Sequence, residues 1–314
     1  VRMAPSHVRF GTFEIFYYRG QHELLKVLAD FVMGAHFKHL QEAPDKYARF
    51  FAEVVERTAK LIAHWQAVGW AHGVMNTDNM SILGLTLDYG PFGFMDDYDA
   101  GFICNHSDHN GRYAFNQQPY IGLWNLSCLA QALLPLAGKE ALKAALDSYT
   151  PTFEREYRAL MRAKLGLIQE WGDDDELIRD FLGLLQGSHA DFTIVFREMG
   201  TFSSQPGMKN EHLREHFLNR DRFDEWAVRY RDRLQSERSR DKERQDAMNR
   251  ANPKYVLRNY LAQNAIESAQ HKDFAEIDRL LSLLQHPYTE QPGMDAYAAP
   301  PPNWGKHLSV SCSS

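Results

Sequence analysis

Hydrophobic residues recur at helical spacing along most of this 314-residue sequence, with few long interruptions. In residues 45–68, for example, Phe51, Val54 and Val55 lie three or four positions apart or side by side, which puts them on one helix face. The interruptions are short and rich in helix breakers such as proline and glycine. The pattern predicts a mostly α fold. Helices are expected over residues 22–37, 45–68 (with Asp45 as its cap), 117–136, 139–148, 151–170, 174–186, 212–236, 255–270 and 272–284.

The composition excludes several classes of protein. With 44% hydrophobic and 24% charged residues, the chain can bury a sizeable core and is not a disordered or fibrous sequence. Its 35 basic and 41 acidic residues give a net charge of −6, so we expect no broad basic surface and no nucleic-acid partner. No apolar run reaches the ~18 residues of a membrane span, so no membrane association is expected. Three cysteines do not make a disulfide framework. We expect a cytoplasmic protein, or a mitochondrial one if its source is eukaryotic.

Changes in residue composition along the sequence divide the chain into three parts. Between residues 69 and 93, glycine, asparagine and aspartate alternate with short apolar pieces typical of brief strands. We therefore expect residues 1–116 to present the polar chemistry and residues 117–286 to form the helical remainder. Within the latter, a mixed-charge run at 237–250 predicts a solvated helix face. Residues 287–314 are proline-rich and predict an extended, weakly ordered tail.

The strongest chemical signal combines Asp78, Asn79 and Asp88. The first two stand side by side, and the third follows a short apolar piece that can pair as a hairpin. Oxygen ligands from the two ends of such a hairpin suit a Mg²⁺ ion that holds nucleotide phosphates. A remaining carboxylate could orient or deprotonate a hydroxyl group. Composition alone also allows two linked turns, because the sequences at 76–79 and 88–91 are both rich in turn-forming residues.

These residues follow the same order along the chain as the catalytic and metal-binding loops of kinases. An Asp-Asn pair comes first, then a short hairpin, then an Asp-aromatic-Gly triplet. Longer strings are more specific than this triplet. Residues 4–13, 65–94 and 252–259 resemble the selenoprotein O family (SelO, also called YdiU) of protein adenylyltransferases. The resemblance extends over the whole chain.

The resemblance implies a protein-kinase-like fold, with this chain as the C-terminal lobe and short β-hairpins at the catalytic and metal-binding loops. It implies transfer of AMP from ATP, or UMP from UTP, to Ser, Thr or Tyr hydroxyls of protein substrates. Asp78 would then be the catalytic base. Asn79 and Asp88 would bind Mg²⁺ or Mn²⁺, with Asp88 also near the nucleotide. Arg2 and Arg9 would bind the nucleotide, a role that suits guanidinium groups.

Two departures from ordinary kinases are visible. Val74 stands two residues after His72, where kinases place their catalytic aspartate, which argues against standard γ-phosphoryl transfer. No glycine-rich loop or helix-paired lysine precedes the catalytic region, and the first residue is Val1 rather than methionine. We therefore expect the chain to lack the N-terminal lobe of the family and to be weakly active or inactive alone.

Two other functions stay open: ordinary γ-phosphoryl transfer on the same fold, and a pseudokinase scaffold whose helical region binds a partner.

Several weaker features have simple interpretations. The cluster formed by His106, Asp108 and His109 is better explained as a polar loop than as a metal site, since no spacing places a fourth ligand. His72 is expected to orient the catalytic loop through backbone hydrogen bonds. Cys312 lies where some SelO proteins carry selenocysteine, and its pairing with Cys104 is a hypothesis.

Overall fold

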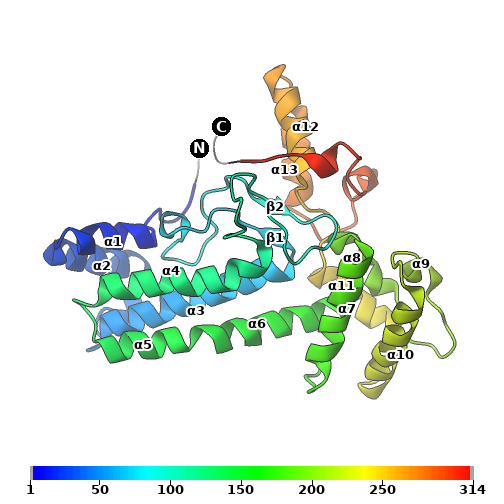
Figure 1. Cartoon of the computed structure of the whole chain (residues 1–314), viewed down its shortest axis with the longest axis horizontal. Helices are drawn as coiled ribbons and strands as arrows, with labels where there is room; N and C mark the ends of the chain where they lie inside the picture. The colour runs from blue at the N-terminus through cyan, green and yellow to red at the C-terminus, as the bar shows by residue number, and fades with distance from the viewer. Residues whose placement is uncertain (1–2, 312–314) are drawn as a thin grey trace.

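The computed structural model describes residues 3–311 and shows a mostly helical protein with one small antiparallel sheet, so the mostly α prediction is confirmed (Figure 1). The sheet pairs β1 (Trp70–Ala71) with β2 (Gly93–Phe94). None of the helices within residues 3–311 is both long and apolar enough to cross a lipid bilayer. The helices are α1 (Phe10–Tyr18), α2 (His22–His36), α3 (Lys46–Ala67), α4 (Gln118–Leu133), α5 (Lys139–Asp147), α6 (Tyr149–Lys164), α7 (Asp174–Ser188), α8 (Phe192–Glu198), α9 (Glu211–Arg214), α10 (Arg220–Ser236), α11 (Asp241–Ala251), α12 (Asn259–Gln270) and α13 (Ala275–Leu284).

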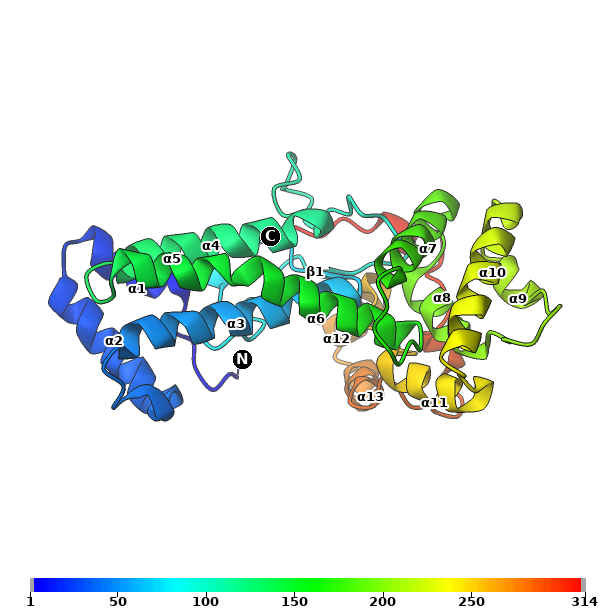
Figure 2. The same cartoon turned by 90° about the horizontal axis from the view of Figure 1, so that it is seen from below.

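The long helix α3 organises the first hydrophobic core. It packs against α4, α5 and α6, and α3, α4 and α6 run side by side along the long axis of the molecule (Figure 1, Figure 2). Its buried face includes Phe50 and Val54. Gly122 of α4 permits a close approach, since a Cβ atom there would lie 2.2 Å from Ile62 Cδ1 and 2.6 Å from the Tyr149 hydroxyl. This packing fixes α4, which borders the candidate site.

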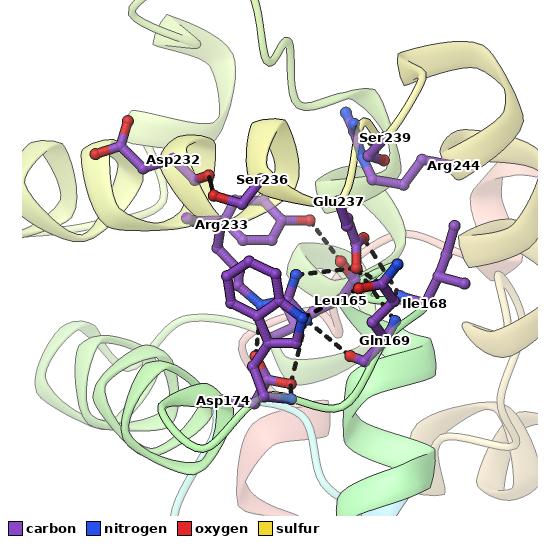
Figure 3. A network of polar contacts seen from close by, with 12 residues as sticks. Leu165, Ile168, Gln169, Asp174, Asp232, Arg233, Ser236, Glu237, Ser239 and Arg244 are labelled. Atoms are coloured by element: carbon purple, nitrogen blue, oxygen red, sulfur yellow. Dashed lines mark hydrogen bonds and ion pairs between the residues drawn. The ribbon is translucent and has the colours of Figure 1, made fainter.

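A second hydrophobic core joins α7, α8, α10 and α11, and a buried ionic network centred on Arg233 lies beside it (Figure 3). Arg233 Nε lies 2.7 Å from Asp174 Oδ1, and its Nη1 lies 2.9 Å from Glu237 Oε2. The guanidinium carbon is also 4.4 Å from the centre of the Trp171 ring. The three charged side chains are at most 7% exposed. The network therefore ties the start of α7 to the end of α10.

Most helices agree with the hydrophobic pattern to within a few residues, and two differ for identifiable reasons. The helix expected over 151–170 is α6, which ends at Lys164 because the chain turns at Gly166, where φ is +68°. The helix expected over 212–236 is divided into α9 and α10. Asn219 starts the second helix by accepting a hydrogen bond from the backbone N–H at its third residue, at 3.1 Å.

Local expectations elsewhere were partly met. Asp45 precedes α3 as expected, but its carboxylate accepts a hydrogen bond from Arg49 Nε instead of capping the helix. The mixed-charge run at 237–250 contains α11, and its ion pair between Lys242 Nζ and Asp246 Oδ1, at 2.9 Å, has the expected spacing of four residues. Helices α1 and α8 were not expected; α1 is nearly apolar throughout and has no amphipathic pattern.

The C-terminal segment up to residue 311 is bonded to the rest of the molecule, so the expectation of weak order does not hold for its described part. It contains the 3-10 turns η5 (Asp295–Tyr297) and η6 (Gly305–His307). Lys306 Nζ lies 2.9 Å from Asp97 Oδ2, and the His106 N–H donates to the Val310 carbonyl oxygen at 2.8 Å. Composition predicts chain stiffness but does not predict these long-range bonds.

Candidate active site

The apolar piece between Asn79 and Asp88 forms a tight hairpin, as its sequence predicts. Met80 and Thr86 are paired as an antiparallel bridge, and a backbone hydrogen bond across residues 81–84 closes the turn. Asn79 directly precedes Met80, and Asp88 lies two residues after Thr86. Asn79 and Asp88 therefore flank the open end of one hairpin.

His72 links the segment that precedes the hairpin to the second half of the hairpin. The Val74 N–H donates to His72 Nδ1 at 3.3 Å, which assigns the ring proton to Nε2. The Nε2 atom then donates to the Leu87 carbonyl oxygen at 2.8 Å. Burial lowers the pKa of His72, so the ring stays neutral. The expectation that His72 orients the loop through backbone hydrogen bonds is confirmed.

Asn79 and Asp88 together offer a donor set that suits a divalent cation. Asn79 is buried, and its Nδ2 donates to the Val74 carbonyl oxygen at 2.9 Å, which leaves Oδ1 as the ligating atom. Asp88 is half-buried in a turn with φ 62°. No group of three or more His, Cys, Asp or Glu side chains is close enough to bind a metal within residues 3–311. A cation here would therefore take its remaining oxygen ligands from a nucleotide or water.

Asp78 lies in the 3-10 turn η2 (Thr77–Asn79), is exposed, and directly contacts the first turn of α1. A Cβ atom added to Gly11 would lie only 2.1 Å from Asp78 Oδ1 and 3.1 Å from its Cγ. Any larger residue at position 11 would therefore collide with this carboxylate. Glycine at this position keeps the space that Asp78 occupies.

Arg9 is brought to the same hairpin by backbone pairing. Arg9 and Ser81 form an antiparallel bridge, and the Phe10 N–H donates to the Met80 carbonyl oxygen at 3.0 Å. The structure thus gathers Arg9, Asp78, Asn79 and Asp88 around one hairpin. Arg2 lies outside the described residues, so its role stays a prediction.

A pocket of about 590 Å³ opens beside Asp88. It is lined by residues 3–5, His7, Leu61 and residues 84–89, and its size is typical of small-molecule sites. Within the described chain, Asp78, Asn79 and Arg9 do not line it.

Another pocket, of about 600 Å³, lies between α6 and α7. Its carboxylates Glu154 and Asp175 both form ion pairs with Arg158, at 3.4 and 2.9 Å. Gln186, an amide that lines this pocket, already accepts a hydrogen bond from the Ala100 N–H through its Oε1 at 2.8 Å. The hairpin is therefore the stronger candidate for chemistry.

The loop around His106 and His109 is structural. The Asp108 carboxylate accepts hydrogen bonds from the backbone N–H groups of Arg112 and Tyr113, at 2.9 and 2.7 Å. These histidines belong to no metal-binding group in the part of the chain that the structure describes. The hydrogen bonds to Asp108 hold residues 108–113 in a polar loop, as the sequence predicts.

Cys104 packs against residues 71–73, and its Sγ lies 3.5 Å from the Ala71 carbonyl oxygen. A Cβ atom on Gly73, whose φ is +80°, would lie 2.7 Å from Cys104 Sγ. Burial raises the pKa of Cys104 to about 12, so its thiol is protonated at neutral pH. Cys104 forms no disulfide with another of the described residues. Cys312 lies outside the described residues, so their pairing stays a prediction.

Sequence reasoning missed three residues that shape this site: Gly11, Gln118 and Asn125. The glycine carries no chemical signal of its own, and only its contact with Asp78 reveals it. Gln118 and Asn125 are fully buried on α4, where they bond the backbone of residues 70–75. Two amides seven positions apart in α4 were the available signal, because that spacing places both on one face.

Comparison with known proteins agrees with the site's composition. Residues 1–285 match the family model described as protein adenylyltransferase SelO. The chain is 57% identical over 314 residues to a protein nucleotidyltransferase YdiU from Myxococcus xanthus and 55% identical over 320 residues to one from Thioalkalivibrio sulfidiphilus. These alignments cover all of this chain but 64% and 65% of the relatives, so it spans somewhat less than two thirds of their length. The chain belongs to the SelO family of protein adenylyltransferases.

Proposed function

We propose that this chain is the catalytic part of a metal-dependent protein nucleotidyltransferase that moves AMP from ATP to protein Ser, Thr or Tyr hydroxyls. The observation that carries the proposal is the hairpin with Asn79 and Asp88 at its open end and Asp78 beside it. The names of the relatives, protein nucleotidyltransferase, support the reaction class. We further propose that the helices form the C-terminal lobe of a kinase-like fold.

Each residue has one task in this reaction. Arg9, joined by Arg2, binds phosphate oxygens through its guanidinium group. Asn79 and Asp88 would hold Mg²⁺ or Mn²⁺, which supplies charge neutralisation of the triphosphate when bound. Asp78 orients the acceptor hydroxyl and takes its proton. The pocket beside Asp88 is large enough to receive part of the nucleotide.

The transfer forms one bond to the α-phosphorus and breaks another. The hydroxyl oxygen attacks the α-phosphorus in line and forms a phosphodiester bond, while the bond from that phosphorus to the oxygen bridging the α- and β-phosphates breaks. Pyrophosphate leaves with the electron pair, and the hydroxyl proton passes to Asp78. Catalysis here is mainly positioning and charge stabilisation. UTP in place of ATP would transfer UMP by the same steps.

The test is a labelling experiment on the full-length native protein, with ATP radiolabelled at either the α- or the γ-phosphate. We expect only the α-label to reach protein, and we expect Asp78→Ala and Asp88→Ala to abolish it. Asp147→Ala is a matched control, because Asp147 is an exposed residue of α5 that forms an ion pair with Lys143.

Other outcomes would select other functions. Transfer of the γ-label would identify an ordinary kinase. Transfer of neither label, with thermal stability unchanged by Mg²⁺ and nucleotide, would favour a scaffold. Retained α-labelling in Asp88→Ala would refute the metal assignment.

A further inference from the structure

The backbone of residues 70–75, which we call the catalytic loop, is held by buried side-chain amides. β1 belongs to a two-stranded sheet, and such a small sheet leaves most of the loop's peptide groups without a strand partner. Buried peptide groups need hydrogen bonds, and here side chains from three segments supply them. Gln118 bonds residues 70 and 72, Asn105 bonds Gly73, Asn79 bonds Val74, and Asn125 bonds Met75.

The Gln118 side chain makes two backbone hydrogen bonds of the kind that a neighbouring strand would make. Its Oε1 accepts a hydrogen bond from the His72 N–H at 2.8 Å, and its Nε2 donates to the Trp70 carbonyl oxygen at 3.0 Å. A primary amide presents a C=O acceptor and an N–H donor toward the same side, as the C=O and N–H of one residue in a neighbouring strand would. Gln118 is fully buried, so water does not replace either bond.

Asn125 holds the next part of the loop. Its Nδ2 donates to the Met75 carbonyl oxygen at 2.9 Å. Its own Oδ1 is buried and has no hydrogen-bond partner in the described structure. A buried acceptor without a partner costs stability that an apolar residue of similar size would avoid. The hydrogen bond to the Met75 carbonyl oxygen is therefore the interaction through which the Asn125 amide stabilises the loop.

Both amides project from one rigid platform. Residues 118 and 125 are seven positions apart, almost two full turns, so they share a face of α4. The close approach at Gly122 fixes that helix against α3 and α6. The loop they hold continues directly into Asp78 and Asn79.

We propose that Gln118 and Asn125 are positioning residues for nucleotidyl transfer. They act on Asp78 and Asn79 through the backbone of residues 70–75 and do not contact the substrate. This inference rests on the proposed function, and it predicts that removing either amide disorders the loop and slows the chemical step more than it weakens nucleotide binding.

The first test measures the loop itself in the 314-residue chain. Gln118→Met and Asn125→Leu remove the amides at similar volume, and Gln131→Met is the matched control on the exposed face of α4. We expect hydrogen exchange of the amides in residues 72–79 to accelerate in the first two variants and to match wild type in the third. Unchanged exchange at His72 in Gln118→Met would overturn the proposal, whatever the activity of the protein.

The second test separates positioning from folding in the full-length native protein. We expect Gln118→Met to lower kcat by about 100-fold, because a misplacement near 1 Å costs that much, with little change in the KM for ATP. Gln118→Glu should rescue kcat at low pH, where the protonated carboxyl group still offers one donor and one acceptor. Its activity should fall as pH rises and the carboxyl group ionises, whereas that of Gln118→Met should stay low at every pH.

The outcomes distinguish the two proposals. If wild type transfers no nucleotide, the proposed function fails, and the exchange experiment alone decides the role of the amides. If wild type transfers nucleotide and Gln118→Met matches it in kcat, the inference fails while the function stands. A parallel loss of activity and thermal stability, without rescue by Gln118→Glu, would also overturn the positioning role.

Discussion

Replacing Gly11 by alanine tests how closely the site is built around Asp78. The added Cβ atom would lie 2.1 Å from Asp78 Oδ1, whereas ordinary contact begins at 3.4 Å, so the carboxylate must move by about 3.4 − 2.1 = 1.3 Å. Asp78 is exposed and the colliding atom is at the end of its side chain, so we expect the side chain to rotate while the helix stays in place.

The expected loss of activity follows from that displacement. A misplacement of about 1 Å costs on the order of 100-fold in rate, which equals about 2.7 kcal/mol of transition-state stabilisation. Stability should not fall in parallel, because alanine is favoured over glycine in a helix by about 0.5–1 kcal/mol. Gly11→Ala should therefore retain its melting temperature and lose most of its nucleotide transfer.

The assay compares initial rates of α-label transfer and urea unfolding for the native protein and two variants. Gly183→Ala is the control, because Gly183 lies inside α7 and an added Cβ atom there meets nothing within 4 Å. We expect this control to be slightly more stable and fully active. A fully active Gly11→Ala protein would refute the role of Asp78, and a loss of folding would refute the reasoning that only its side chain moves.

Two further predictions concern stability. Arg233→Ala should lower the free energy of unfolding by about 3–5 kcal/mol, because it leaves buried Asp174 and Glu237 without their cation; a loss below 1 kcal/mol in urea unfolding would contradict this. The hydrogen bond to Glu198 raises the pKa of His216, so this pair should stabilise the protein below the unfolded pKa near 6.5 and lose its effect as pH rises through the higher folded value. Urea unfolding of His216→Gln against wild type should show the largest difference on the acid side, and a difference that grows with pH would refute the assignment.

The sequence contained enough information to predict the parts of the fold that depend on local patterns. Helices α2 and α3 begin and end where their apolar periodicity does, and the hairpin between Asn79 and Asp88 forms where two turn sequences enclose an apolar piece. These features depend on residues near one another in the chain, so one sequence is sufficient to place them.

Features that depend on distant contacts were not predictable. The end of α6 depends on Gly166, where a Cβ atom would lie 2.4 Å from the Arg244 side chain, almost eighty residues away in the sequence. The role of Gly11 appears only when α1 is packed against η2. The same holds for Gln118, whose two backbone partners lie more than forty residues before it. Tertiary packing decides such positions, and no local pattern encodes them.

The central claim is that Asn79 and Asp88 bind one divalent cation together with a nucleotide. Paramagnetic broadening of backbone amide signals by Mn²⁺ in the presence of ATP tests it directly in the full-length protein. We predict that the amide signals of residues 78–80 and 87–89 broaden first, that those of residues 106–109 do not, and that Asp88→Ala removes the effect. Strongest broadening elsewhere, or equal broadening in Asp88→Ala, would contradict the account.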